Sequence, residues 1–389
     1  MQLAYTQIIV LGNGFDLAQH IPSSYPAFFQ HRYREYANSN GSISSLMQKL
    51  SRSPLSGGNC AWDYLFAFWH DTSRKLNEWK NVEDAIKDWI VGSKSIGLDD
   101  AIAYWNGDIL NLNRSCAQRK LYSTLEKHIS SSIPQINSSS TNQQRNDLHK
   151  ELLDYFFNEL HVIEDVFANY LDEMVNSNPS CEPCCYATYK NIAKAGGTEV
   201  PLEEQSNAIL SFNYTMPMSL FKEPSVYYLR NVHGDLGRLQ DEWKSGHEYH
   251  VVFGIDGQSC MDQPGIYQFT KTARVLSLRR QHILDDMKNR TLFDAQNTDD
   301  GIAEVKFFGH SLGEADYSYF QSLFDLIDLY GGKTKLTFCG TKMHPVNPDA
   351  VIRLMTKYGE TVVPEAHGKN LLHKLLMEDR LKIEEISPL

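Results

Sequence analysis

The sequence predicts an α/β fold, a Rossmann-like parallel sheet with a large helical insertion between its first strand and the rest. An apolar run rich in branched residues, QIIVL at 7–11, ends in a glycine-rich turn, which is typical of a strand. Apolar residues at helical spacing dominate from about 25 to 200. Beyond residue 207, strand-like runs alternate with helical patterns, which favours parallel, doubly wound strands.

The first strand is followed by Gly12, Asn13 and Gly14. Glycines let the backbone turn tightly and approach a ligand closely. A helix that starts just after them offers free N–H groups to a phosphate. The full G-x-G-x-x-G pattern is missing, because Leu17 stands three residues after Gly14. The segment is therefore either a phosphate-binding turn or a tight turn without a ligand.

The helical insertion is expected over 31–204, and the nucleotide-binding domain over 1–30 and 205–389. The clearest helix spans 150–175. Its apolar residues follow helical spacing: Leu153, Phe156, Leu160, Ile163, Phe167, Tyr170 and Met174. Such side chains favour packing in a core or bundle. The segment 130–146, rich in Ser, Asn and Gln, predicts a mobile loop.

The remaining strands are expected in the C-terminal half of the chain. Strand-like runs occupy 208–213, 226–234, 248–256, 303–311 and 334–340. Helical patterns alternate with them at 270–290, 316–330, 347–358 and 368–384. This alternation makes one α/β domain whose first strand comes from the N-terminus.

The composition narrows the classes of partner. The formal net charge of the 389 residues is −11, and basic runs are short, so a nucleic-acid partner is not expected. The longest apolar stretches fall far short of the ~20 residues that a membrane span requires. The N-terminus has no basic segment before its apolar run, so it predicts a strand rather than a signal peptide.

The seven cysteines are scattered, which favours reduced thiols and a cytoplasmic location. Cys181, Cys184 and Cys185 cluster in the sequence CEPCC, without a second C-x-x-C pair. They form either an incidental loop cluster or part of a structural zinc site. The sequence leaves this open, and no metal is predicted.

Ligands of open α/β sheets bind beyond the carboxyl ends of the strands. Many polar side chains of this sequence follow the predicted strands at those ends: Asn13, Asp16, Asn213, His233, Asp235, Asp256, His310, Ser311 and Asp316. Such a set predicts one ligand site along this rim of the sheet.

The segment Gly309 to Gly313 reads G-x-S-x-G, the pattern of a hydrolase nucleophile elbow. A serine nucleophile needs a histidine and an acid later in the chain, and candidates such as His344 and Asp325 follow. The alternative is that Ser311 caps a helix, with Glu314 as its capping-box partner.

Several of these segments together resemble the AbiH-type bacteriophage abortive-infection proteins. The resemblance rests on IIVLGNGFDLAQHIPSSYPAFF (8–29), WKNVEDAI (79–86), AILSFNYT (208–215), NVHGD (231–235), VFGID (252–256) and KFFGHSLGEADYSYF (306–320), in the family's order. It implies a bacterial antiphage protein.

That family in turn resembles, more distantly, the sirtuin-like NAD-binding proteins. The likeness implies catalytic roles for Asn213 and His233, which match an Asn at a strand end and a catalytic His-Gly. It implies cofactor-binding roles for Gly12, Asn13, Gly14, Asp16, Asp256, Gly309, His310, Ser311 and Asp316. Thr215 replaces the Asp of the sirtuin T-N-x-D motif, so protein deacylation is not expected.

The resemblance leads to one main expectation about function and two alternatives. The protein is expected to be an abortive-infection effector that hydrolyses NAD at the nicotinamide–ribose bond. It is alternatively a non-catalytic nucleotide-binding sensor of a defence system, or a serine hydrolase that uses Ser311. A nucleotide is the expected ligand, and a second copy or a defence-system protein is the expected partner.

Overall fold

The computed structural model describes residues 5–72, 79–92, 96–107, 114–136, 141–215, 217–236, 251–257, 260, 263–277 and 301–387. The chain divides into two compact units. The sheet unit comprises Met1–Ser23, Leu171–Val251 and Leu278–Leu389. The helical unit comprises Ser24–Tyr170 and Val252–Ser277. The segment 171–204, which the sequence assigns to the insertion, thus belongs to the sheet unit.

The sheet unit is built on six parallel strands. They are β1 (Tyr5–Leu11), β2 (Gln205–Ser211), β3 (Val226–Asn231), β4 (Glu304–Phe308), β5 (Lys335–Gly340) and β6 (Leu381–Glu385). Their order is β3-β2-β1-β4-β5-β6, the doubly wound order in which the direction of strand addition reverses between β1 and β4. The prediction of a parallel α/β sheet with a helical insertion after its first strand is confirmed.

The register of β3 against β2 carries one irregularity. Asn207 pairs with Val226, but Ala208 pairs with Tyr228, so Tyr227 is an extra residue in β3. From there the pairing runs regularly to Ser211 opposite Asn231. The bulge therefore determines which residue of β3 stands at the carboxyl end of the sheet.

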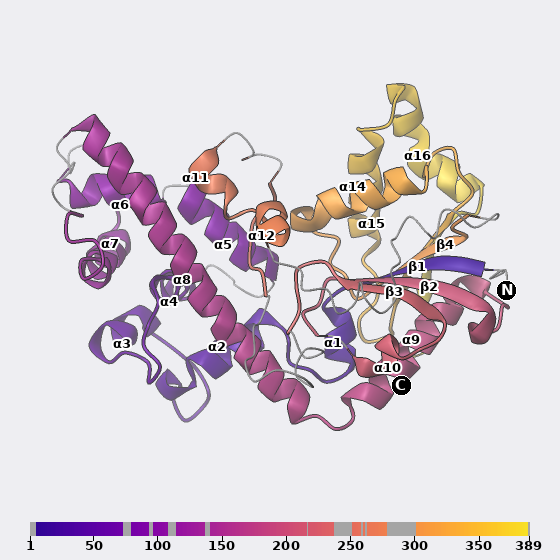
Figure 1. The fold of residues 1–389 in the computed structure, drawn as a ribbon, viewed down its shortest axis with the longest axis horizontal. Coiled ribbons are helices and arrows are strands. Elements are labelled where there is room, and N and C mark those ends of the chain that lie inside the picture. The colour runs from indigo at the N-terminus through magenta and orange to yellow at the C-terminus, as the bar shows by residue number, and fades with distance from the viewer. Residues whose placement is uncertain are drawn as a thin grey trace. The chain divides into compact units, whose positions relative to one another are not determined.

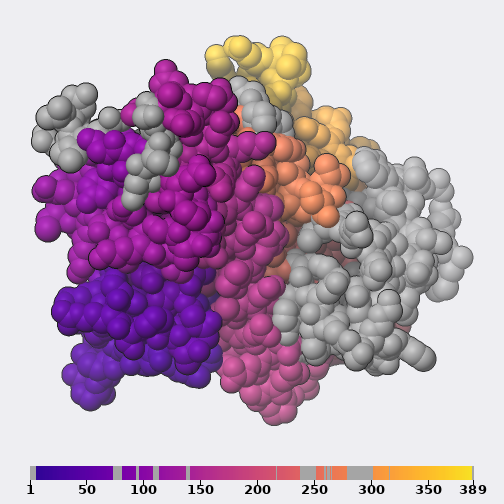
Figure 2. Space-filling view, turned by 60° about the vertical axis from the view of Figure 1, so that its left-hand side comes forward, coloured from indigo at the N-terminus to yellow at the C-terminus, as the bar shows by residue number. Residues whose placement is uncertain are grey.

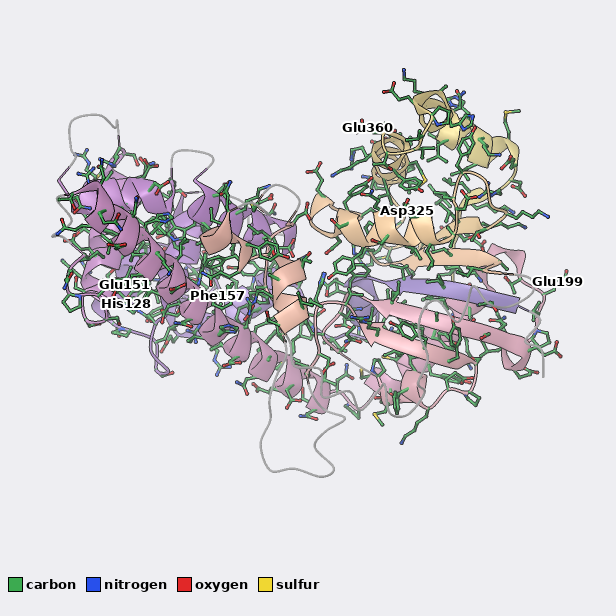
Figure 3. All side chains as sticks on the ribbon, turned by 45° about the horizontal axis from the view of Figure 1, so that its top comes forward. His128, Glu151, Phe157, Glu199, Asp325 and Glu360 are labelled. Carbon is green, nitrogen blue, oxygen red and sulfur yellow. The ribbon has the colours of Figure 1, made fainter. Side chains whose placement is uncertain are left out.

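Helices cover both faces of the sheet (Figure 1). One face carries α14 (Tyr317–Leu326), α15 (Pro348–Gly359) and α16 (Glu365–Met377), and the other carries α1 (Gly14–Ala18), α9 (Cys181–Lys194) and α10 (Met218–Phe221). In Figure 3, Asp325 and Glu360 mark the first layer, and Glu199 lies at the end of the sheet where the strands begin.

The two faces of the sheet differ in polarity. Toward α14–α16, apolar side chains such as Phe307, Phe324 and Leu354 form a continuous buried cluster. Toward α9, polar side chains are buried in hydrogen bonds: the Lys306 ammonium donates to the Ala193 carbonyl at 2.8 Å. Burial lowers the pKa of Lys306.

The helical unit packs its helices around aromatic side chains. Its helices are α2 (Tyr25–Arg32), α3 (Leu46–Arg52), α4 (Ala61–Asp71), α5 (Trp79–Val91), α6 (Leu98–Trp105), α7 (Cys116–Ile129), α8 (Asn142–Asn176, its end in the sheet unit), α11 (Pro264–Tyr267) and α12 (Lys271–Ser277). The Trp62 indole donates to the Phe156 carbonyl at 3.0 Å, and their rings meet edge to face. Figure 2 shows the purple segments of the helical unit packed closely against one another.

The predicted long helix is confirmed, and its apolar residues from Leu153 to Tyr170 are buried. Its start differs from the expectation, because α8 begins at Asn142. Residues 142–146 of the predicted loop 130–146 are therefore helical, residues 130–136 form turns as expected, and 137–140 lie outside the described residues. Within the described chain, no helix combines the length and apolar character that crossing a bilayer requires.

Two expectations fail, one for a strand and one for a helix. Residues 251–256 form no strand, and only a single bridge joins Ile255 to Thr270. The Phe253 backbone instead forms hydrogen bonds within the helical unit. Its N–H donates to Glu164 at 2.5 Å, and its carbonyl accepts from Arg274 at 2.9 Å. Residues 248–250 lie outside the described part. The second failure is at 368–384, where α16 ends at Met377 and β6 follows.

Candidate functional site

The turns after β1 and β4 meet at the point where the strand order reverses. The Gly12 N–H donates to the Phe308 carbonyl at 2.9 Å, and the Gly14 N–H donates to the Gly309 carbonyl at 2.8 Å. A Cβ atom on Gly14 would lie 2.5 Å from the Gly309 Cα. The glycines thus allow two backbones to touch. Two of the N–H groups expected for a phosphate are used within the sheet unit.

Asp316, at the start of α14, lies between two histidines. Its Oδ1 is 3.1 Å from Nε2 of His233, which follows β3, and its Oδ2 is 3.4 Å from Nε2 of His310, which follows β4. The side chain of His233 is only 6% exposed and that of His310 is 5% exposed. One carboxylate therefore lies within ion-pairing distance of two imidazoles that come from different strand ends.

The ring of His310 has a defined orientation. The Leu312 N–H donates to its Nδ1 at 2.9 Å, so Nδ1 acts as the acceptor and Nε2 carries the hydrogen that faces Asp316. Leu312 reaches this position with a φ of +55°, in the left-handed region. The turn thus accepts backbone strain at the residue that orients the imidazole.

Aromatic rings enclose the two histidines. The Phe212 ring lies 5.3 Å from the His233 ring and 4.6 Å from the His310 ring, edge to face in both cases. The Tyr319 ring lies 5.5 Å from His233. Its hydroxyl donates to the Val232 carbonyl at 3.4 Å. This apolar wall restricts water around the imidazoles and strengthens their interaction with Asp316.

Asn213 lies at the end of β2 with 3% of its surface exposed. Its amide nitrogen donates to the Gly12 carbonyl at 3.1 Å. Its Oδ1 is buried and has no hydrogen-bond partner among the described residues. A buried acceptor without a partner is costly, so this oxygen suits a ligand that brings a donor.

Asn231, the last residue of β3, supports Asn213 from behind. Its amide nitrogen donates to the Asn213 carbonyl at 2.8 Å and to the Thr215 carbonyl at 2.9 Å. Asn231 was not among the site residues predicted from the sequence. Its position two residues before His233, at the end of a predicted strand, was the available signal, because residues at this spacing share one face of a strand.

Asp16, in α1, is 1% exposed and accepts a hydrogen bond from the Thr215 hydroxyl at 2.6 Å. Burial raises the pKa of its carboxyl to about 7, although hydrogen bonds from Thr215 and Ser23 act in the opposite direction. Ser23 also donates to the side-chain oxygen of Asn13 at 2.6 Å. Asp16 and Asn13 therefore hold the turn after β1.

The model of the bacteriophage abortive infection AbiH family matches residues 8–337. The chain belongs to the AbiH family. The match includes the turns after β1 to β4 and every residue of the site described above. No curated protein and no solved structure matches this AbiH chain.

The G-x-S-x-G turn of this AbiH protein differs from a nucleophile elbow. Ser311 is exposed, and no hydrogen bond in the described chain joins its hydroxyl to a histidine. The left-handed residues of the turn are Gly309, with φ of +67°, and Leu312. Ser311 does not cap a helix either, because the residue before the short helix at Glu314–Asp316 is Gly313, without a side-chain cap.

The other predicted residues have separate places. Asp256 belongs to the helical unit, in the segment Val252–Ser277. Cys181 and Cys185 are buried in α9 with their Sγ atoms 3.8 Å apart. Among the described residues, no three His, Cys, Asp or Glu side chains are grouped so as to hold a metal ion.

Proposed function

We propose that this abortive-infection antiphage protein acts by hydrolysing NAD at the nicotinamide–ribose bond. The observation that carries the proposal is the Asp316 carboxylate between His233 and His310, at the same carboxyl edge of the sheet as the unpartnered Oδ1 of Asn213. An oriented base next to a buried acceptor is the arrangement that directs one water or hydroxyl at a sugar carbon.

Cleavage of the nicotinamide–ribose bond needs little acid catalysis from the protein. The nicotinamide ring of NAD is already cationic and leaves as neutral nicotinamide, through an oxocarbenium-like state of the ribose. The protein has to hold the ribose, exclude bulk water and place one attacking water. The buried position of Asn213 and the aromatic wall of Phe212 and Tyr319 suit these tasks.

Each polar residue has a defined part in this mechanism. Asn213 Oδ1 accepts a hydrogen bond from the attacking water or a ribose hydroxyl, while its amide nitrogen stays on Gly12. The Asp316 carboxylate, 3.1 Å from His233, stabilises the imidazole as it takes a proton from the attacking water. His310 shares the same carboxylate and holds it in place.

The choice of NAD rests on the likeness to sirtuin-like proteins. GNGFD, SFNYT, NVHGD and GHSL occur in the order of the sirtuin-like motifs, and all four lie at the carboxyl ends of parallel strands. The strand order is also that of dinucleotide-binding sheets. Loss of NAD would arrest an infected cell and so the phage.

The deciding experiment incubates the purified protein with NAD and follows nicotinamide and ADP-ribose, with and without extract from phage-infected cells. We expect product with the wild type, and at least about a hundredfold less with Asn213→Ala or His233→Ala. His373→Ala is the matched control, since His373 is exposed within α16.

Other outcomes favour the alternatives. NAD binding without product under every condition would indicate a non-catalytic sensor. Loss of activity in Ser311→Ala, together with a fluorophosphonate label on Ser311, would indicate a serine hydrolase. The exposed position of Ser311 speaks against that last outcome.

A further inference from the structure

β6 forms one edge of the sheet. It pairs with β5 on one side, and in the part of the chain that the structure describes no strand pairs with its other side. An open strand edge presents unpaired N–H and C=O groups and is a template for another strand. The chemistry of this edge therefore indicates what it can pair with.

The backbone groups that face outward follow from the bonds to β5. The Leu336 N–H donates to the Arg380 carbonyl at 2.6 Å, and the Ile386 N–H donates to the Gly340 carbonyl at 2.8 Å. Bonding residues alternate along a parallel pair. The backbone groups of Ile383, with those of its neighbours two residues away, consequently point away from β5.

The edge is complementary to itself. An antiparallel pair of two β6 strands about a twofold axis at Ile383 lets the two Ile383 residues exchange backbone hydrogen bonds. The same register places Lys382 of each copy opposite Glu384 of the other, on one face of the sheet. Within each chain, Lys382 Nζ lies 3.2 Å from Asp379 and the Glu384 carboxylate accepts from the Gly196 N–H at 2.7 Å, so the pairs across the axis share these charged groups. Parallel pairing of two β6 strands would not place Lys382 opposite Glu384 in both directions, because no twofold axis perpendicular to the strands relates a parallel pair.

Exposed apolar side chains flank both ends of β6. Leu376 and Met377, at the end of α16, are 54% and 88% exposed, and they precede the start of β6. Met343 is 77% exposed and follows β5, whose end pairs with the end of β6. In an antiparallel pair, the start of one β6 lies beside the end of the other, so these apolar groups come together.

We propose that two copies of this chain associate through their β6 edges, which joins their sheets into one. A lysine on a short edge strand discourages pairing with unrelated strands. Opposite Glu384 of a second copy, the same lysine favours pairing. Ile383, 45% exposed, lies on the axis of the dimer. The proposal does not depend on NAD hydrolysis.

The test measures the mass of the full-length protein by sedimentation velocity over a range of concentrations. We expect a dimer for the wild type. Ile383→Lys places two ammonium groups against each other on the axis and should raise the dimer dissociation constant at least about tenfold. Ile352→Lys is the matched control, because Ile352 on α15 is 46% exposed and away from this edge.

A second measurement locates the axis directly. Ile383→Cys brings two thiols together, about 5.5 Å apart between Cα atoms, and a short bis-maleimide should link them. Ile352→Cys should give only the background of the wild type, whose exposed thiol is Cys116. A monomer at all concentrations, equal effects of the two lysine variants, or no linkage above background for Ile383→Cys would overturn the proposal.

Discussion

Nε2 of His233 lies 3.1 Å from Oδ1 of Asp316, although the two residues follow different strands and are more than 80 positions apart in the chain. The sheet brings them together because the carboxyl ends of parallel strands share one edge. The pair unites two motifs, NVHGD and GHSLGEAD, in one arrangement of side chains.

Asp316→Asn is the sharpest test of this pair. The amide can no longer hold both imidazoles as a carboxylate does, so we expect the rate of NAD hydrolysis to fall by about 10²-fold or more. Glu314→Gln, an exposed change in the same turn, should leave the rate unchanged. Equal rates for the two variants would remove Asp316 from the mechanism.

Asn231→Asp tests the support behind Asn213. An aspartate cannot donate to the carbonyls of Asn213 and Thr215, so two buried acceptors lose their donor. We expect a loss of about 1–3 kcal/mol in the free energy of unfolding, measured with urea. Asn191→Asp removes an exposed bond to the Ser387 carbonyl and should cost less than about 0.5 kcal/mol.

Asp16 makes stability depend on pH in an unusual direction. Its carboxyl has a pKa of about 7 in the folded protein, against the ordinary value of 3.8 that applies to the unfolded chain. At pH values between these two, the folded protein therefore binds more protons than the unfolded chain. This contribution to stability is present at low pH and is lost as the pH rises from about 4 to 7. The loss reaches up to about 4 kcal/mol and stays constant above pH 7.

Urea unfolding of wild type and Asp16→Asn between pH 4 and 8 measures this contribution. The asparagine can still accept from Thr215 but does not titrate. We expect the variant to gain stability relative to the wild type as the pH rises. A constant difference between the two proteins across this range would show that Asp16 does not titrate there.

Gly14→Ala tests the contact between the two turns. The added Cβ would lie 2.5 Å from the Gly309 Cα, where only backbone could yield. We expect a loss of stability of about 1–3 kcal/mol or more, read from thermal denaturation. Gly57→Ala is the control, because nothing lies within 4 Å of its Cβ position. Similar melting temperatures for both variants would contradict this account.

The sequence was most informative where strands are buried on both faces. Apolar runs that end in glycine or a polar residue located β1 to β5, and with them the rim that carries Asn213 and His233. β6 was missed because LKIEE lies half-exposed at an edge and has no apolar run. VVFGI at 251–255 was mistaken for a strand because it is equally apolar, although most of it is buried in the helical unit.

The site itself was predictable in its members and not in its contacts. Polar residues after buried strands gave Asn213, His233, His310 and Asp316. Asp316 faces both histidines because of the conformation of the turn after β4, which includes the left-handed Leu312. The spacing of residues in the sequence does not reveal that conformation. The glycine turn after β1 looked like a phosphate loop, but packing against Gly309 explains its glycines.

The extra residue Tyr227 in β3 affects where the residues at the end of that strand lie. Tyr227 lies near the start of β3, at the end away from the site. The shift in pairing register that it introduces is nevertheless what brings Asn231 opposite Ser211. Without Tyr227, the chain would still contain every polar group of the site. The polar groups of β3 would each move about 3.3 Å along the strand, to the opposite face of the sheet. The length of β3 therefore matters to the site as much as the identity of the histidine that follows it.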